Sequence, residues 1–341
     1  MSNQSSERPA GFTADAADAQ IHHAERKHEK YEQLIARTKD IPAIPTAVAW
    51  PCEAHALAGP VDAARQGIIE PILIGPEARI RKIAAEAALD LSGLTIHDVA
   101  TESEAAVQAV TLAHDGKVHA LMKGSLHTDV LMHPVVAGTP NLRTGRRISH
   151  VFLLDAPSYD EVLYVTDAAI NIFPDIETKR DIVQNAIDLF NGLKGASRKA
   201  DEPRVAILSA VEVINPKIPG TTDAAILCKM ADRGQITGGI LDGPLAMDNA
   251  IDPEAARIKR ITSPVAGRAQ ILVVPDLEAG NMLAKNLIFL AGADAAGIVV
   301  GAAVPIILTS RADSVSARLA STAVGALYGH YLMQQKQERD V

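Results

Sequence analysis

The chain has 341 residues, more than the ~100–200 typical of one domain, and 48% of them are apolar while only 3% are aromatic. Packing through Ala, Val, Ile and Leu is typical of helices that cover parallel strands, so the sequence predicts an α/β fold. The net charge of −8 excludes recognition of a nucleic acid through a broad basic surface. Two cysteines and the lack of any run of ~18 apolar residues indicate a soluble cytoplasmic protein without a membrane partner.

The first predicted elements follow a polar N-terminal stretch. Residues 1–20 are rich in Ser, Ala and Asp and are expected to be disordered, and a charged helix is predicted over residues 24–38. Strands and helices then alternate, with strands at 46–49, 70–74, 94–98 and 119–122 and helices at 53–66, 77–88 and 102–115. This alternation is typical of right-handed βαβ units that build a parallel sheet.

A polar, basic segment over residues 123–147 follows and indicates a boundary between two lobes. Beyond it the sequence predicts strands at 151–154, 164–165, 204–208, 239–241 and 271–274, and helices at 176–193, 221–233 and 252–262. The last unit consists of a strand at 296–301, a short apolar run at 305–308 and a helix from about residue 313.

The junction of this last strand and helix is the first candidate site. Ser310 and Arg311 place a hydroxyl and a guanidinium at the carboxyl edge of the predicted sheet, where ligands of open α/β folds bind and where anions meet helix N-termini. Asp313 or Ser314 is also a good helix cap. A helix cap would explain Asp313 or Ser314 but not Ser310 and Arg311. From local sequence alone, the segment is either an anion-binding site or only the start of a helix.

Two other segments carry candidate substrate contacts. Gly124 follows a strand and would let the backbone approach a ligand closely, although the spaced glycines of a Walker loop are absent. The cationic loop after it suits phosphate groups, and a solvated loop explains it equally well. The candidates from these segments are Lys123, Gly124, Ser125, Thr128, Arg143 and Arg147.

Polar residues also follow a strand of the second lobe. Asp242, Asp248 and Asn249 either orient a ligand or close turns and cap the next helix. No GxGxxG follows the first strand, so no nicotinamide dinucleotide is predicted. His127 and His133 lack the clustered spacing of metal ligands, so no metal is predicted either.

Taken in order, these segments resemble one known family over residues 47–327. The matching stretches are Val48–Glu53, Glu70–Gly75, Met122–Thr128, Val151–Leu154, Tyr164–Asn171, Leu208–Glu212, Leu241–Asp248, Val274–Asp276 and Ser310–Arg311. They are similar to the phosphate acetyltransferase/phosphate butyryltransferase family, and most similar to its butyryltransferase-like branch, which also includes enzymes named phosphate acetyltransferases. Eight or more matches in order are far more specific than any single motif.

The resemblance implies two α/β lobes like those of isocitrate/isopropylmalate dehydrogenases, the second inserted into the first, with coenzyme A (CoA) in the cleft between them. Residues 1–145 and 300–341 are expected to form domain 1 and residues 146–299 domain 2. A homodimer or a higher homo-oligomer is implied, as is common among soluble enzymes. Only about forty residues precede the match, so the N-terminal hydratase domain of some members is expected to be absent.

The implied reaction transfers a short acyl group, acetyl in the first place, between CoA and inorganic phosphate. The CoA thiolate attacks the acyl phosphate directly, with no acyl-enzyme and no permanently bound cofactor. By resemblance, Ser310 donates to the transition state and Arg311 binds the phosphoryl group. The acetyltransferase branch has an Asp seven residues after that Ser as the proposed thiol base, but this chain has Ala317 there. The thiol is therefore activated either by Asp313 or by local positive charge.

Three other interpretations compete. The first keeps the chemistry and makes the chain a phosphate butyryltransferase. The second is a non-catalytic acyl-CoA sensor, like the similar domain fused behind malic enzymes, because fold alone does not decide function. The third, a dehydrogenase of the related fold, requires carboxylate clusters for a metal and a nucleotide site, which the sequence lacks.

Overall fold

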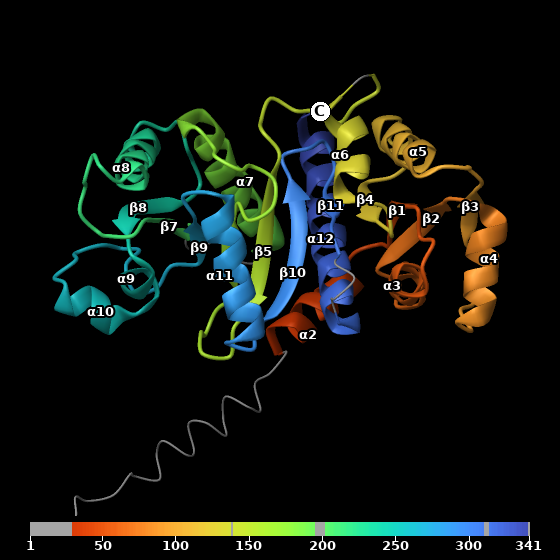
Figure 1. The fold of residues 1–341 in the computed structure, drawn as a ribbon, viewed down its shortest axis with the longest axis horizontal. Coiled ribbons are helices and arrows are strands. Elements are labelled where there is room, and N and C mark those ends of the chain that lie inside the picture. The colour runs from red at the N-terminus through yellow and green to blue at the C-terminus, as the bar shows by residue number, and fades with distance from the viewer. Residues whose placement is uncertain (1–28, 138, 195–201, 310–313, 340–341) are drawn as a thin grey trace, which may run out of the picture.

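An eleven-stranded sheet runs along the long axis of the molecule in the computed structural model (Figure 1). The structure describes residues 29–137, 139–194, 202–309 and 314–339. The strand order is β3-β2-β1-β4-β11-β10-β5-β6-β9-β7-β8, and most neighbouring strands are parallel. Together with the helices that pack on the sheet, this confirms the predicted α/β class.

One end of the sheet is parallel and matches the predicted alternation. Its strands are β1 (Ile44–Ala49), β2 (Ile69–Ile74), β3 (Thr95–His97) and β4 (Ala120–Lys123), and the helices between them are α3 (Ala54–Arg65), α4 (Glu77–Glu86) and α5 (Glu102–His114). Thr101 starts α5 with a capping box in which Glu104 reaches back to the backbone of Thr101. Within the predicted N-terminal helix, the described residues form α2 (Glu29–Ala36) and the 3-10 helix η1 (Arg37–Asp40).

The centre of the sheet is antiparallel, which the sequence did not predict. β10 (Asp294–Val300) runs antiparallel to β11 (Ile306–Ile307) and to β5 (Ser149–Asp155), and β5 runs antiparallel to β6 (Leu163–Thr166). Only residues 156–162 connect β5 to β6, and only residues 301–305 connect β10 to β11. Such links are too short for a parallel crossover, so β5 with β6 and β10 with β11 form hairpins. The antiparallel pairing of β5 with β10 joins both halves into one sheet.

The other end of the sheet is parallel again. β9 (Ile271–Val273) pairs with β6 and β7 (Arg204–Leu208), and β8 (Ile240–Leu245) forms the edge. The helices of this half are α7 (Ile176–Lys194), α8 (Pro219–Asp232) and α10 (Pro253–Ile258). α10 is shorter than the predicted helix over 252–262, and the Asp252 side chain caps it by accepting from the Glu254 amide.

Three helices were not predicted. They are α6 (Thr128–Val136), α9 (Met247–Ile251) and α11 (Leu277–Phe289). α6 contains Pro134 and lies in the segment that the sequence indicated as a loop. α11 had a usable signal, because the Asp276 side chain accepts from the Ala279 amide as a helix cap. α11 packs on β5 and β6 (Figure 1).

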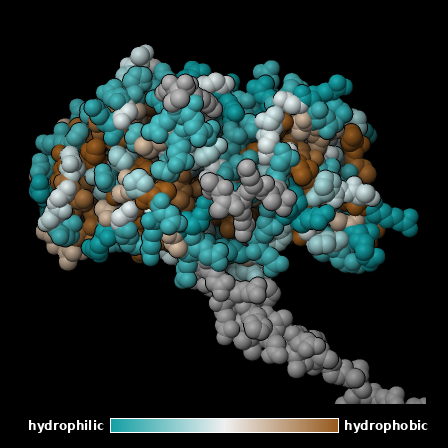
Figure 2. Space-filling view, turned by 180° about the vertical axis from the view of Figure 1, so that it is seen from behind, coloured by the Kyte–Doolittle hydropathy of each residue, from teal (hydrophilic) through white to brown (hydrophobic). Residues whose placement is uncertain are grey.

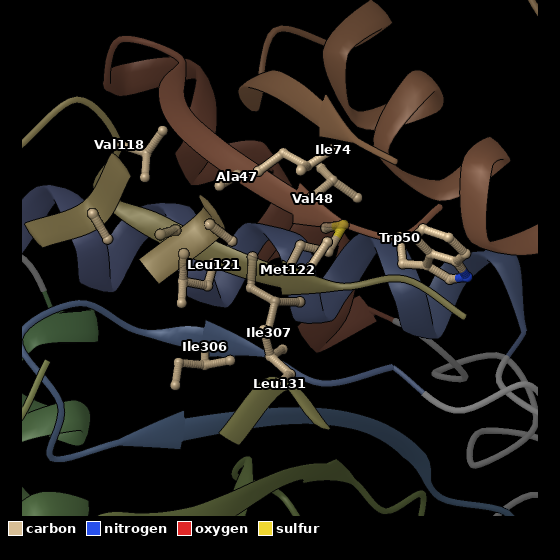
Figure 3. Close-up of a cluster of buried hydrophobic side chains, with 14 of the residues drawn as sticks. Ala47, Val48, Trp50, Ile74, Val118, Leu121, Met122, Leu131, Ile306 and Ile307 are labelled. Carbon is tan, nitrogen blue, oxygen red and sulfur yellow. The ribbon is translucent and has the colours of Figure 1, made fainter. Parts of the chain in front are cut away.

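The apolar core forms three clusters around the sheet. The first lies between β1, β4 and β11, where Val48, Met122 and Ile307 come together (Figure 3). On β5, Val151 and Leu153 join the second cluster, with α7 and α12 (Val315–Arg339), whereas Leu154 joins the third. Successive strand residues point to opposite faces, so helices cover both sides of the central strands.

The strands of the two predicted lobes occupy different parts of the sheet. β1 to β4 and β11 occupy one end, while β5 to β10 occupy the centre and the other end. The domain boundaries themselves stay a prediction. Seen from behind, the surface is largely hydrophilic with separate hydrophobic areas (Figure 2). In the part of the chain that the structure describes, no helix is both long and apolar enough to cross a membrane.

Candidate active site

Three turns meet at the carboxyl ends of β1, β4 and β11. They are residues 50–52 after β1, residues 124–126 after β4, and residues 308–309 after β11. Ile307 pairs with Met122 in the parallel ladder, so Leu308 follows alongside Lys123. This is the sheet edge that the sequence indicated for ligand binding. Ser310, Arg311 and Asp313 lie outside the described residues, and Leu308 and Thr309 lead into them.

Gly124 allows the turn after β4 to pack directly on the turn after β1. A Cβ atom on Gly124 would lie 2.4 Å from the carbonyl oxygen of Trp50 and 2.5 Å from that of Ala49. The Gly124 amide donates to Ala49 O at 2.9 Å. In the structure this glycine brings the turn after β4 close to Trp50, and its predicted close approach to a ligand stays a prediction.

Ser125 and Lys123 hold the same two turns together. Ser125 Oγ donates to Trp50 O at 2.9 Å and accepts from the Cys52 amide at 3.3 Å. Lys123 Nζ donates to the carbonyls of Gly124 and Leu126 at 3.3 and 3.1 Å. The Lys123 ammonium is therefore fixed at the carboxyl end of β4, next to the strand that leads into Ser310.

Ser314 is the N-cap residue of α12. Ser314 Oγ accepts from the Ala317 amide at 3.1 Å, which is the bond of an N-cap residue. The sequence left the cap open between Asp313 and Ser314, and the structure gives it to Ser314. Ala317 is buried and offers no group to a thiol. Arg318 Nη1 donates to the His55 carbonyl at 3.3 Å, which ties this helix to α3.

Arg143 and Arg147 lie on an exposed stretch just before β5, beside the carboxyl end of β10. This is the edge of the sheet opposite to the three turns. Arg143 forms an isolated bridge with Ala302, and the Arg147 amide donates to Asp181 Oδ2 at 3.0 Å. Neither guanidinium forms an ion pair with another described residue. Arg146, between them, pairs with Asp188. The backbone of this stretch is thus fixed, while the charges of Arg143 and Arg147 face solvent.

Asp248 and Asn249 belong to a polar cluster at the far end of the sheet. Lys259 Nζ bridges Glu212 and Asp248, each at 3.1 Å, and Asn249 Nδ2 donates to Glu212 Oε2 at 3.3 Å. The hydrogen bond from Lys259 lowers the pKa of both carboxyl groups. Asp242 is separate and accepts from the Gly243 amide. No local sequence pattern pointed to Lys259, since it is 47 residues from Glu212 in the chain.

The structure does not bring all predicted substrate contacts together. β4, which carries Lys123, and β7, which leads to Glu212, are six strand positions apart. At ~4.8 Å per strand this is roughly 29 Å, so a small acyl phosphate cannot touch both ends. Thr128 is half-buried at the first position of α6, near the Lys123 turn.

A buried histidine and carboxylate lie near the centre of the sheet, and no local sequence pattern pointed to either of them. His150 on β5 is 3% exposed, and its Nδ1 is buried with no hydrogen-bond partner in the described structure. Burial lowers the pKa of His150 to about 4, although the Asp167 charge opposes this shift. Asp167 itself is 3% exposed and accepts bonds from the amides of Ala169, Ile170 and Asn171.

Neither cysteine is poised as a nucleophile. Burial raises the pKa of the Cys52 thiol to about 11 and that of Cys228 to about 12. Both thiols are therefore protonated near neutral pH and unreactive. Within the ranges that the structure describes, no three His, Cys, Asp or Glu side chains gather to hold a metal ion.

Two hollows of about 520 and 860 Å³ lie on either side of the turn between β5 and β6. Asp160 and Glu161 line both of them. Neither includes the turns after β1, β4 and β11. We place the candidate active site at those turns because the fixed cation, the strand ends and the start of α12 converge there.

Comparison with known proteins supplies the family context. The sequence pattern of the family described as phosphate acetyl/butaryl transferase matches residues 100–326, more than half of the chain. A phosphate acetyltransferase of Rhizobium meliloti is 63% identical over 300 residues, which cover 88% of this chain and 93% of the relative. A phosphate butyryltransferase of Clostridium beijerinckii is 38% identical over 299 residues, which cover 88% and 97%.

A solved structure shares the fold over nearly all of its length. A branched-chain phosphotransacylase from Enterococcus faecalis superimposes with a TM-score of 0.73 at 28% identity. The match covers 84% of this chain and 99% of that protein.

Proposed function

This chain belongs to the phosphate acetyl/butyryl transferase family, and on that premise we propose that it transfers an acetyl group reversibly between CoA and inorganic phosphate. The observation that carries the proposal is the 63% identity to a phosphate acetyltransferase over 300 residues. The phosphate butyryltransferase relative is 38% identical, so acetyl is favoured over butyryl.

The proposed reaction is a direct acyl transfer. The CoA thiolate attacks the carbonyl carbon of acetyl phosphate, a carbon–sulfur bond forms, and the carbon–oxygen bond breaks with its electron pair leaving on phosphate. A thiol of pKa ~8.5 is mostly protonated at neutral pH, so its proton must pass to a base or be lost to solvent in cationic surroundings. The buried, protonated state of Cys52 fits a route without an acyl-enzyme on a cysteine.

The strand end at Leu308–Thr309 and the first turn of α12 support the proposed roles of Ser310 and Arg311. The N-terminus of α12 favours a negative charge beside it, and the Lys123 ammonium adds a second positive group at the same edge. Ser310 would donate to the transition-state oxyanion, and Arg311 would bind the phosphoryl group. Since Ser314 caps the helix, Asp313 is proposed as the side-chain candidate for the thiol base.

We further propose that Lys123, Gly124, Ser125 and Thr128 contact the substrates CoA and phosphate at the carboxyl end of β4. Arg143 and Arg147 lie at the opposite edge of the sheet, so they are proposed to contact a more distant part of CoA. Asp242, Asp248 and Asn249 are separated from Lys123 by most of the sheet, so on one chain they could reach only a distant part of CoA. The enzyme is proposed to act in the cytoplasm as a homodimer or higher homo-oligomer, without a permanently bound cofactor.

A panel of acyl-CoA substrates tests this function. Purified protein should release CoA from acetyl-CoA only when phosphate is present, with arsenate able to replace phosphate, and kcat/KM should fall from acetyl-CoA to butyryl-CoA. A thiol reagent can follow the release, with enzyme lacking acyl-CoA as the blank for the two protein thiols. Release without phosphate, or no release from any acyl-CoA, would overturn the proposal and favour the sensor. A higher kcat/KM for butyryl-CoA would make the chain a butyryltransferase.

A further inference from the structure

Large apolar side chains are exposed along the helix α11. Met282 on this helix is 61% exposed, Phe289 at its last position is 74% exposed, and Leu290 directly after it is exposed as well. Ile172 and Phe173 are exposed at the other end of the helix, where the first amide of α11 donates to the Ile172 carbonyl. Two of the five phenylalanines of an aromatic-poor chain thus face solvent along one helix. Exposed apolar surface that gathers in one place is typical of an interaction site.

The inner side of α11 already holds the helix on its sheet. It packs on β5 and β6 (Figure 1), and Leu283 and Leu287 join the third apolar cluster beside Leu154 and Val165. The outer apolar residues are therefore not needed to fix the helix. A helix that is apolar on its outer side as well is typical of one that is covered on both sides.

The segment that ends in Ile172–Phe173 is fixed on α11. Asn281 Nδ2 donates to the Ala168 carbonyl at 3.2 Å. Gly280 lies so close to the same segment that a Cβ atom on it would be 2.7 Å from the Asp167 carbonyl oxygen. The exposed apolar residues at both ends of α11 therefore belong to one preformed surface, and a preformed surface loses less conformational entropy when a partner binds.

Two opposite charges lie between the apolar ends of this surface. Glu278 and Lys285 are exposed on the same side of the helix as Met282 and Phe289, because these four positions are three or four residues apart. In the described part of the chain, neither Glu278 nor Lys285 forms an ion pair. The two charges lie equally far from the midpoint between positions 281 and 282.

A twofold axis through this midpoint makes the surface complementary to itself. If α11 packs antiparallel on α11 of a second copy, Glu278 of each copy lies opposite Lys285 of the other, and the two Met282 side chains meet near the axis. The same arrangement brings Phe289 of each copy to the end of the other helix that carries Ile172–Phe173. A twofold interface uses the same patch on both subunits, and opposite charges within it fix their register.

We propose that two copies of this chain form a twofold dimer through this face of α11, with the two α11 helices packed antiparallel. The residues that make the face are Ile172–Phe173, Glu278, Met282, Lys285 and Phe289–Leu290. The inference rests on the proposed homodimer, because it gives that dimer its contact surface.

Exchange of the two charges tests the pairing directly. Sedimentation velocity should find the wild-type protein at twice the 36.0 kDa of one chain. Glu278→Lys and Lys285→Glu each place like charges opposite each other at two symmetric positions, so each should raise the dissociation constant of the dimer by about tenfold or more. The double variant Glu278→Lys/Lys285→Glu restores opposite charges, so its dissociation constant should return to within about threefold of the wild-type value.

A substitution near the axis tests the apolar part of the surface. Met282→Glu places two carboxylates next to each other at the centre of the interface, so it should raise the dissociation constant by about 100-fold or more. Val107→Glu is the matched control, since Val107 is also an exposed apolar residue but lies on α5, which packs on β1 and β2 in the other half of the sheet. The control should dimerise as the wild type does, and far-UV circular dichroism checks that each variant is folded.

Four outcomes would overturn the inference. They are a wild-type protein that sediments as a monomer, single charge variants that dimerise as tightly as the wild type, a double variant that dimerises no more tightly than the single ones, and a folded Met282→Glu variant with an unchanged dissociation constant. Phosphate-dependent CoA release is measured on the same wild-type sample. Its absence from a dimeric wild type would overturn the proposed transferase activity and leave the α11 interface standing.

Discussion

Replacing Gly124 with alanine should separate the two turns that build the edge of the site. The added Cβ would lie 2.4 Å from Trp50 O, 2.5 Å from Ala49 O and 2.6 Å from the Trp50 carbonyl carbon, and all three are backbone atoms that cannot rotate away. The turns must move apart, which weakens the bonds from the Gly124 and Ser125 amides, both 2.9 Å long. Two weakened hydrogen bonds and the overpacking together should cost about 2–5 kcal/mol of unfolding free energy.

Trp50 makes this loss measurable at the turn itself, because it is the single tryptophan of the chain. Urea unfolding followed by Trp50 fluorescence and by far-UV circular dichroism should show a lower midpoint for Gly124→Ala. Gly145→Ala is the control, since no atom lies within 4 Å of its added Cβ, and its stability should stay within about 0.5 kcal/mol of the wild type. A Gly124→Ala midpoint equal to that of the control would refute the close-approach argument.

The remaining predictions concern catalysis and pH. Ser310→Ala should lower kcat about 10²–10³-fold, and Arg311→Gln should mainly raise KM for phosphate; unchanged kinetics in both variants would remove them from the site. Asp313→Asn should stay active, with a rate that rises with pH as the thiolate forms, because the α12 N-terminus and Arg311 favour the anion. A fall of more than about a hundredfold at unchanged thermal stability would instead make Asp313 the base. The folded protein holds the pKa of His150 at about 4, against 6.5 for the unfolded chain, so the unfolded state binds more protons between these values. Stability should therefore fall as the pH drops from 6.5 towards 4, and His150→Gln should remove about 3 kcal/mol of that fall in urea titrations. The same pH dependence in both proteins would contradict the burial of a neutral imidazole.

The local pattern of the sequence predicted most strands because their apolar runs are bounded by turns. β7 was predicted with the bounds that the structure has, and β1, β2 and β4 within two residues. The carboxyl end of β11, which leads into Ser310 and Arg311, also followed from local order, since a strand that leads into a helix ends at the ligand-binding edge of a parallel sheet.

Contacts between distant parts of the chain could not be predicted from local pattern. The role of Gly124 depends on Trp50, which is far from it in the sequence, and the Lys259–Glu212 pair joins residues 47 positions apart. Pro134 hid α6, because a proline within a short apolar segment is more typical of a loop. The burial of His150 could not be predicted from its sequence neighbours. Its Nδ1 has no hydrogen-bond partner because of the residues that surround it in three dimensions.

The central claim is direct transfer of the acetyl group between phosphate and CoA, and isotope exchange tests it most directly. Enzyme is incubated with acetyl phosphate and labelled inorganic phosphate, with and without CoA. Direct transfer predicts that label enters acetyl phosphate only when CoA is present, because CoA is the acceptor that releases phosphate and returns the acetyl group. Exchange without CoA would show an acetyl-enzyme and contradict direct attack, and no exchange with CoA would contradict the transferase activity itself.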